Sequence, residues 1–103
     1  MDSMIVKRLN EFSEKYKKLE DDNKFDDALQ EIENALLYLT TKLEGGMNFV
    51  DKEILSSYTR DYQVVRRTMR TSKRLYELEQ RVDNLSFQVG KISKDFENKT
   101  EFK

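Results

Sequence analysis

The sequence predicts an all-α protein whose long helices pack lengthwise with coiled-coil character, and three observations carry this prediction. Apolar residues make up 37% of the chain and charged residues 38%, with no Pro and only three Gly, which is typical of long helices with narrow apolar stripes. Apolar residues recur at alternating spacings of three and four along most of the chain, as they do on one face of a helix. Finally, two oppositely charged blocks flank Gly45 and Gly46. The acidic block, residues 20–33, has seven acids and one lysine, and the basic block, residues 60–74, has six basic groups and one acid. A chain reversal at the glycines would place these blocks side by side. We therefore expect a long antiparallel helical hairpin or a three-helix bundle, with a turn at the glycine pair.

Length and composition set the organisation and exclude several classes of protein. With 103 residues, a net charge of −1 and 11% aromatic residues, we expect one folded domain at 1–97 and a flexible tail at 98–103. The chain has no Cys and no His, so it has no thiolate or imidazole to bind a metal or act as a base. No apolar run is long enough to cross a bilayer, and the first residues do not resemble a secretory signal. We expect a protein that is cytoplasmic or otherwise intracellular.

The first helix is predicted at about 3–20. Asp2 or Ser3 can accept a hydrogen bond from a free backbone N–H at its start. Residues 20–24 are polar and have low helix propensity, so they form either a turn or a kink in a continuous helix. Its apolar residues are spaced four, three, four and three apart, and they are Ile5, Leu9, Phe12, Tyr16 and Leu19.

The second helix is predicted at about 24–44 and ends at the glycine pair, because Gly accepts the left-handed conformation common just past a helix. Its apolar arc is wide, which indicates contact with more than one neighbour. The arc comprises Phe25, Ala28, Leu29, Ile32, Ala35, Leu36, Leu37, Tyr38, Leu39 and Leu43.

The third helix is predicted at about 51–97, with Asp51 as its cap and a hydrophobic staple between Val50 and Leu55. Its first half uses one apolar series, Ile54, Tyr58, Tyr62, Val65 and Met69. Its second half uses another, Leu75, Leu78, Val82, Leu85, Val89, Ile92 and Phe96. The two series do not join smoothly across residues 70–74.

Two pairings of these helices are possible. In the hairpin, Asp21 faces Arg74, Asp22 faces Lys73, and the first helix packs against residues 75–89. In the three-helix bundle, the first helix folds back beside the second, and residues 75–96 project as an amphipathic helix that needs another chain. Both pairings leave apolar surface uncovered, so we expect a homo-oligomer such as a dimer, or a partner protein.

No arrangement of residues indicates catalysis. Acid pairs one turn apart, such as Asp27 and Glu31, lack the His that carboxylate metal sites in bundles also use. The serines have no base partner, and Gly45-Gly46 lacks the Lys-Ser/Thr ending of phosphate-binding loops. We expect no enzyme activity, no cofactor, no metal and no small-molecule substrate.

The expected function is that of a non-catalytic helical interaction factor, meaning a small subunit, adaptor or regulator that docks onto another protein. The expected docking residues are Leu75, Leu78, Val82, Leu85, Val89 and Ile92, with Leu37 and Tyr38 as a second candidate. The alternative is a nucleic-acid-binding regulator that contacts phosphates through Arg66, Arg67, Arg70, Lys73 and Arg74. The pI of about 5.6 and the acidic block oppose this alternative. Binding to a membrane surface is not expected, because mixed charges surround the apolar stripes.

Overall fold

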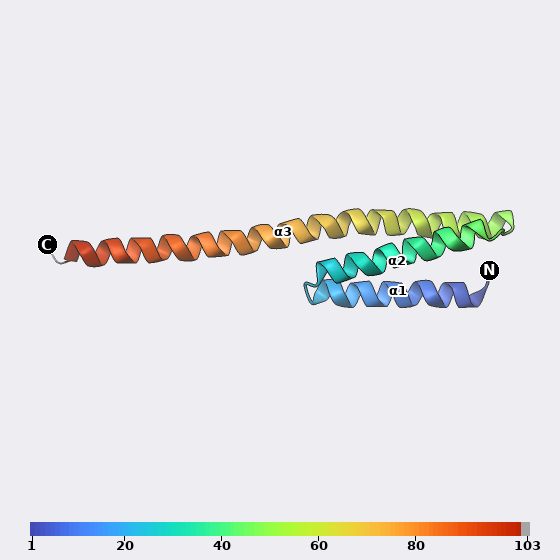
Figure 1. Ribbon diagram of the computed structural model, residues 1–103, viewed down its shortest axis with the longest axis horizontal. Helices are drawn as coiled ribbons and strands as arrows, with labels where there is room; N and C mark the ends of the chain where they lie inside the picture. Colours follow the sequence, from blue (N-terminus) through green and yellow to red (C-terminus); the bar gives the residue numbers. More distant parts are fainter. Residues whose placement is uncertain (102–103) are drawn as a thin grey trace. The chain divides into compact units, whose positions relative to one another are not determined.

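The computed structural model describes the backbone of residues 1–101 and the side chains of residues 1–97. Within that range the chain forms three helices, α1 (Ser3–Asp21), α2 (Phe25–Glu44) and α3 (Phe49–Glu101), shown in Figure 1. The predicted all-α class is confirmed. The chain divides into two compact units, Met1–Lys73 and Arg74–Lys103.

Helix α1 begins and ends with hydrogen bonds that its sequence provides. One side-chain oxygen of Asp2 accepts a hydrogen bond from the backbone N–H of Met4 at 2.9 Å, so Asp2 is the cap. At the other end Asn23 has a φ of 58°, a left-handed conformation that Asn tolerates better than most residues. The N–H of Asn23 donates to the carbonyl oxygen of Glu20 at 2.9 Å, and that of Lys24 to the carbonyl oxygen of Leu19 at 2.8 Å. This pair of bonds is a Schellman motif, which stops the helix without Gly or Pro.

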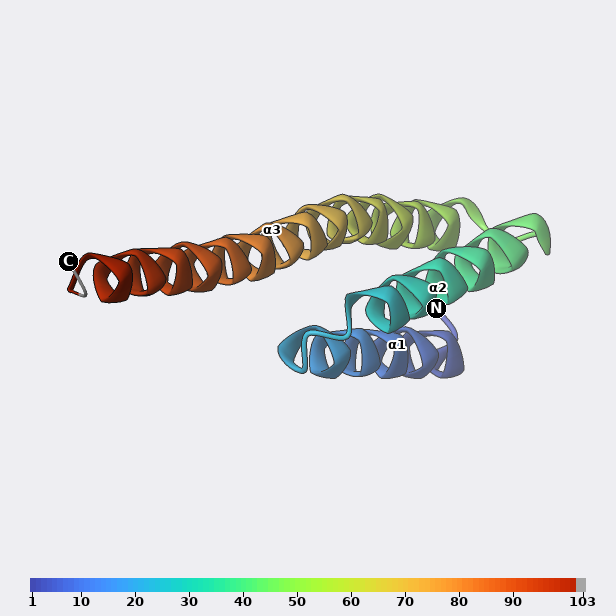
Figure 2. The same cartoon turned by 60° about the vertical axis from the view of Figure 1, so that its left-hand side comes forward.

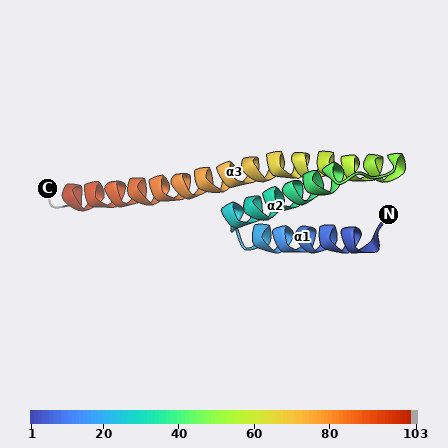
Figure 3. The same ribbon diagram turned by 45° about the vertical axis from the view of Figure 1, so that its right-hand side comes forward.

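The turn at Asn23 sends α2 back along α1, and the two helices lie side by side in Figures 1, 2 and 3. Within Met1–Lys73 the three-helix arrangement is therefore the correct alternative. Leu9, Phe12 and Tyr16 of α1 are buried inside this unit. The predicted packing of α1 against residues 75–89, which the hairpin required, is wrong.

The second connection follows Glu44, where the predicted turn at the glycines is present. Gly46 has a φ of 79°, which is unfavourable for any residue with a side chain. The cap of α3 is Asn48, whose side-chain oxygen accepts a hydrogen bond from the N–H of Asp51 at 2.8 Å. Asp51 is thus three residues inside the cap, where its carboxylate accepts from the Asn48 amide at 3.2 Å. The predicted Asp51 cap and the staple from Val50 are wrong, because α3 begins two residues earlier than predicted.

Among the side chains of residues 1–97, the buried apolar ones lie between Ile5 and Met69. Buried residues of α2 include a series seven residues apart, and those of α3 are spaced the same way, as expected for helices packed along their lengths. The buried residues among those described are Ile5, Leu9, Phe12, Tyr16, Phe25, Ala28, Ile32, Ala35, Leu39, Leu55, Tyr62 and Met69.

The acidic and basic blocks meet between α2 and α3, although not through the predicted pairs. Lys73 donates to Asp26 at 2.6 Å rather than to Asp22, a change of four residues or about one helical turn. Arg66 donates to Glu33 at 3.0 Å. Charge pairing of the two blocks is therefore real, but the predicted partner of Lys73 is wrong.

Helix α3 continues through the second unit as far as Glu101, beyond the predicted end at 97. The last two residues of the predicted tail, 102 and 103, lie outside the described residues. Every side chain described in this unit is exposed except that of Tyr76, which is half-buried.

Candidate protein-interaction surfaces

The largest apolar feature of the second unit is a stripe on α3 that we call the distal seam. Its members alternate at spacings of three and four residues, so the helix places all of them on one side. Their side chains are 51–70% exposed. The distal seam consists of Leu75, Leu78, Val82, Leu85, Val89, Ile92 and Phe96.

The earlier part of the same helix shows what such spacing does when a neighbour is present. Leu55, Tyr62 and Met69 are also seven residues apart, but they are 0%, 4% and 2% exposed because α1 and α2 cover them. The distal seam has the same pattern and the opposite burial. It is therefore an apolar helix face that residues 1–97 leave in contact with water.

Four of the seven residues beside the distal seam are charged. In heptad notation, where seam positions are a and d, the flanking positions are e and g. Arg74, Arg81 and Asp95 are at g and Glu79 is at e, while the other flanking residues are uncharged, namely Ser86, Gln88 and Ser93. The seam is thus bordered by charges near both of its ends and by neutral polar residues between them.

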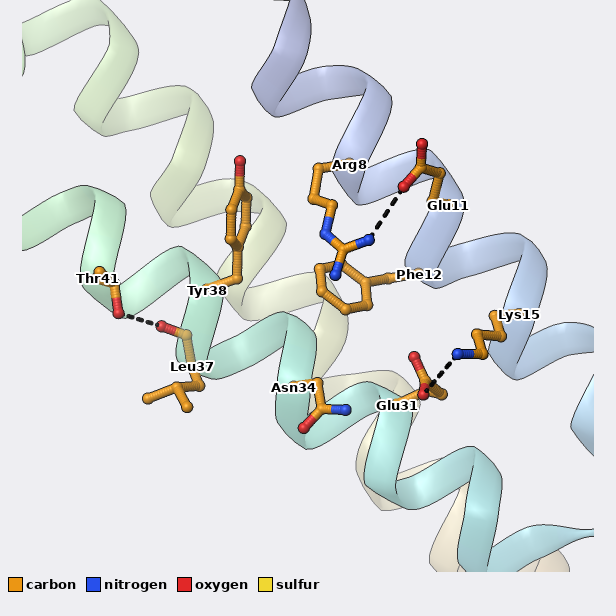
Figure 4. Close-up of a pocket in the computed structure, with 9 residues that line it drawn as sticks. All are labelled: Arg8, Glu11, Phe12, Lys15, Glu31, Asn34, Leu37, Tyr38 and Thr41. Carbon is orange, nitrogen blue, oxygen red and sulfur yellow. Dashed lines mark hydrogen bonds and ion pairs between the residues drawn. The ribbon is translucent and has the colours of Figure 1, made fainter.

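The second predicted docking site, Leu37 and Tyr38, lies in a groove between α1 and α2 (Figure 4). Leu37 is 68% exposed and is available for contact. Tyr38 is half-buried, because its ring packs against that of Phe12 with 5.9 Å between the centroids. Only Leu37 of the two is a surface residue. The groove is lined by Arg8, Glu11, Phe12, Lys15, Glu31, Asn34, Leu37, Tyr38 and Thr41.

The charges in this groove are paired with one another. Arg8 lies over the Phe12 ring at 4.5 Å, a cation–π contact, and also pairs with Glu11 at 3.1 Å. Lys15 of α1 reaches across to Glu31 of α2 at 3.3 Å, and Figure 4 shows this pair beside the Phe12 ring. The groove therefore has balanced charge and a partly aromatic floor, and the Lys15–Glu31 pair connects α1 to α2.

The predicted phosphate-binding residues are largely engaged with acids of α2. Glu33 is 3.0 Å from Arg66 and 3.9 Å from Arg70, and Lys73 is paired with Asp26. Arg67 and Arg74 are exposed. The structure thus brings the basic stripe against the acidic block, which neutralises much of it.

A polar cluster inside the bundle was missed from the sequence. The Tyr62 hydroxyl lies 2.7 Å from the Ser13 hydroxyl and 2.8 Å from the Leu9 carbonyl oxygen. Burial raises the pKa of Tyr62 above 10.0, an effect that the Ser13 hydrogen bond partly offsets and that Tyr16 and Tyr58 add to. Burial, and then the nearby charge of Glu20, likewise raises the pKa of Tyr16. The available signal was the position of Ser13, four residues after Leu9 and three before Tyr16, which puts it on the buried face of α1.

Two further observations concern metals and membranes. Among the described residues, no group of three or more acidic side chains is placed to hold a metal ion. None of the helices, over the part of the chain that was searched, combines the length and the apolar character needed to cross a membrane.

Comparisons with known proteins do not identify the chain. No protein-family model, no curated protein and no solved structure matches it. Its function must therefore be inferred from the surfaces described above.

Proposed function

We propose that this protein is a non-catalytic helical interaction factor, a small subunit, adaptor or regulator, that docks onto another polypeptide through the distal seam. One observation carries the proposal: seven apolar side chains on one face of α3 are more than half exposed. An exposed apolar stripe of this regularity is characteristic of a surface that another chain covers.

The energy of covering the seam supports this proposal. Complete burial of a Leu, Val or Ile side chain contributes about 1.5 to 3 kcal/mol relative to exposure. A helix draws most of its stability from packing its apolar face rather than from intrinsic propensity. A partner that covers residues 75–96 would therefore stabilise both the complex and the helix itself.

The features of Met1–Lys73 are consistent with a structural role for this unit and a docking role for the distal seam. Met1–Lys73 has its own buried core, whereas no side chain described in the second unit is buried. The basic stripe, in turn, is paired with Glu33 and Asp26 and is less available to phosphates. Of the two functions considered, docking onto a protein is the one supported by an uncovered surface.

Site-specific photo-crosslinking in the native cell tests the proposal. A photoreactive residue at Leu85, in the seam, should give a covalent adduct with another polypeptide. The same residue at Gln80, which lies on the opposite face of the helix, is the matched control and should give little adduct. Equal yields at the two positions, or none at either, would contradict docking through the seam.

A further inference from the structure

We propose that the partner of the distal seam is a second copy of this chain, and that the two seams form a parallel, in-register, two-stranded coiled coil. This inference deepens the proposed function and rests on it. It follows from the residue types in the seam, the number of seam positions and the charges beside them.

The residue types favour two strands. With Leu75 at position a, the two central a positions are Val82 and Val89, and the d positions that precede them along the helix are Leu78 and Leu85. A β-branched residue at a combined with Leu at d favours parallel dimers over larger assemblies, because the side chains fit the different holes at each position. The pattern is sustained over three heptads, a length that indicates a coiled coil.

The number of seam positions favours the parallel orientation. The seam has four a positions and three d positions. A parallel, in-register pair matches all seven, each against its own copy. In an antiparallel pair, each a residue lies opposite a d residue of the other copy. Because there are only three d positions, at most three of the four a residues have a seam residue opposite them.

The flanking charges agree with this arrangement. In a parallel pair, a g residue lies near the e residue five positions later on the other helix. Arg74 of each copy would then meet Glu79 of the other, giving two attractive pairs. Both residues are exposed, and neither takes part in an ion pair among the side chains that the structure describes. The next two flanking pairs, Arg81 with Ser86 and Gln88 with Ser93, introduce no repulsion.

Antiparallel pairing would also offer Arg74 an acid, Asp95, so charge alone does not choose the orientation. The count of matched seam positions makes that choice, and cysteine scanning can measure it. The native chain contains no Cys, so a disulfide between two copies of a single-Cys variant can join only the two introduced residues.

The experiment compares Leu78→Cys, Ile92→Cys and Gln80→Cys in a glutathione redox buffer, beside sedimentation of the unmodified full chain. The expected result is a dimer of about twice 12.3 kDa, with disulfides at 78 and at 92 but not at the outward control position 80. In the antiparallel pairings that match most positions, residue 78 lies opposite 89 or 96 of the other copy. Two residues 78 would then be about 16 Å apart or more, beyond the reach of a disulfide.

A second variant tests the contribution of the seam. Val82→Asp combined with Leu85→Asp should raise the dissociation constant of the dimer about 100-fold or more, because each copy brings two charges into the buried interface. The circular dichroism and thermal unfolding of the Met1–Lys73 core should persist in this variant. An undiminished dimer, absence of disulfides at 78 and 92, or a chain that sediments as a monomer up to about 100 µM would overturn the inference.

The photo-crosslinking at position 85 separates failure of this inference from failure of the proposed function. An adduct with the mass of two copies supports both. An adduct with a different protein, together with a monomer in sedimentation, overturns the second-copy inference and leaves docking through the seam standing. Absence of any seam-specific adduct, together with a monomer, overturns both.

Discussion

The Tyr62 hydroxyl donates a hydrogen bond to the backbone carbonyl oxygen of Leu9, 2.8 Å away, and so connects α3 to α1 across the bundle. Because the hydroxyl has a single proton, the 2.7 Å contact with Ser13 must use the Ser13 hydroxyl as the donor. Tyr62 is 4% exposed, so this arrangement is almost free of competing water. It fixes which face of α3 meets α1.

Removing this hydroxyl should destabilise the bundle. In Tyr62→Phe, we expect the free energy of unfolding to fall by about 1 to 2 kcal/mol, because the hydrogen bonds to Leu9 and Ser13 are lost in a buried site. Urea denaturation followed by circular dichroism measures the change. Tyr58→Phe, on the same helix, is the matched control and should change stability by less than about 0.5 kcal/mol. Equal losses in the two variants would show that the hydrogen bond network contributes nothing specific.

The raised pKa of Tyr62 predicts a loss of stability in alkali. Above pH 10 the unfolded chain releases the tyrosine proton, while the folded protein still holds it. The folded state therefore binds more protons, and the free energy of unfolding must fall as the pH rises. Unfolding curves between pH 8 and about 11 should show this decline, and Tyr62→Phe should make it shallower than in the unmodified chain. A slope unchanged by the substitution would contradict the assignment.

Two leucines of α2 provide a direct test of the core. Leu39 is 0% exposed and Leu37 is 68% exposed. Leu39→Ala should cost about 2 to 5 kcal/mol through lost burial and a residual cavity, whereas Leu37→Ala should change stability by about 0.5 kcal/mol or less. Thermal and urea unfolding of both variants measure the difference. Comparable losses would mean that α2 presents a different face to the bundle.

The turn between α1 and α2 should depend on the backbone conformation of Asn23. Asn23 has a φ of 58°. Asn23→Ala should destabilise the protein by about 1 kcal/mol, because Ala has a Cβ that disfavours this φ and lacks the polar side chain that allows Asn to form local hydrogen bonds there. Asn23→Gly should be neutral or slightly stabilising, since Gly adopts this φ readily. Unfolding experiments on the two variants distinguish this turn from a continuous kinked helix, in which Gly would be the more damaging substitution.

Gly90 lies within α3, and a Cβ added there would meet no atom within 4 Å. Gly90→Ala should therefore raise the helicity of the second unit, since Gly costs about 1 kcal/mol relative to Ala in a helix interior. Circular dichroism at 222 nm, measured across a dilution series, should show more helix in Gly90→Ala than in the unmodified chain at low protein concentration. A decrease in helicity would indicate that the position faces a neighbour rather than solvent.

The helices themselves were predictable because their apolar spacing is regular, and because Asp2 before α1 and the glycine pair after α2 are recognisable end signals. The turn at residues 20–24 could be located but not distinguished from a kink, since no Gly or Pro marks it. The signal for a turn was Asn23, because Asn adopts a left-handed backbone conformation more readily than most residues. A turn there distinguishes the three-helix arrangement from the hairpin, since both arrangements use the same apolar seams.

The partners of individual charges were harder to predict than the pairing of the two blocks. Lys73 bonds Asp26 rather than Asp22, because Asp22 lies in the turn after α1 whereas Asp26 lies in the first turn of α2. The Tyr62 hydrogen bonds were missed for a related reason. They depend on which turn of α1 lies opposite the ring, and the periodic pattern of one helix does not determine that.

All the buried apolar side chains described lie before Arg74. The extension after this point can therefore accumulate substitutions, or be exchanged for a different helix, without any cost to the folding of the bundle. Selection could retune the affinity or choice of partner in one segment while leaving the scaffold intact, which makes the boundary near Lys73 a natural place for evolutionary or engineered recombination.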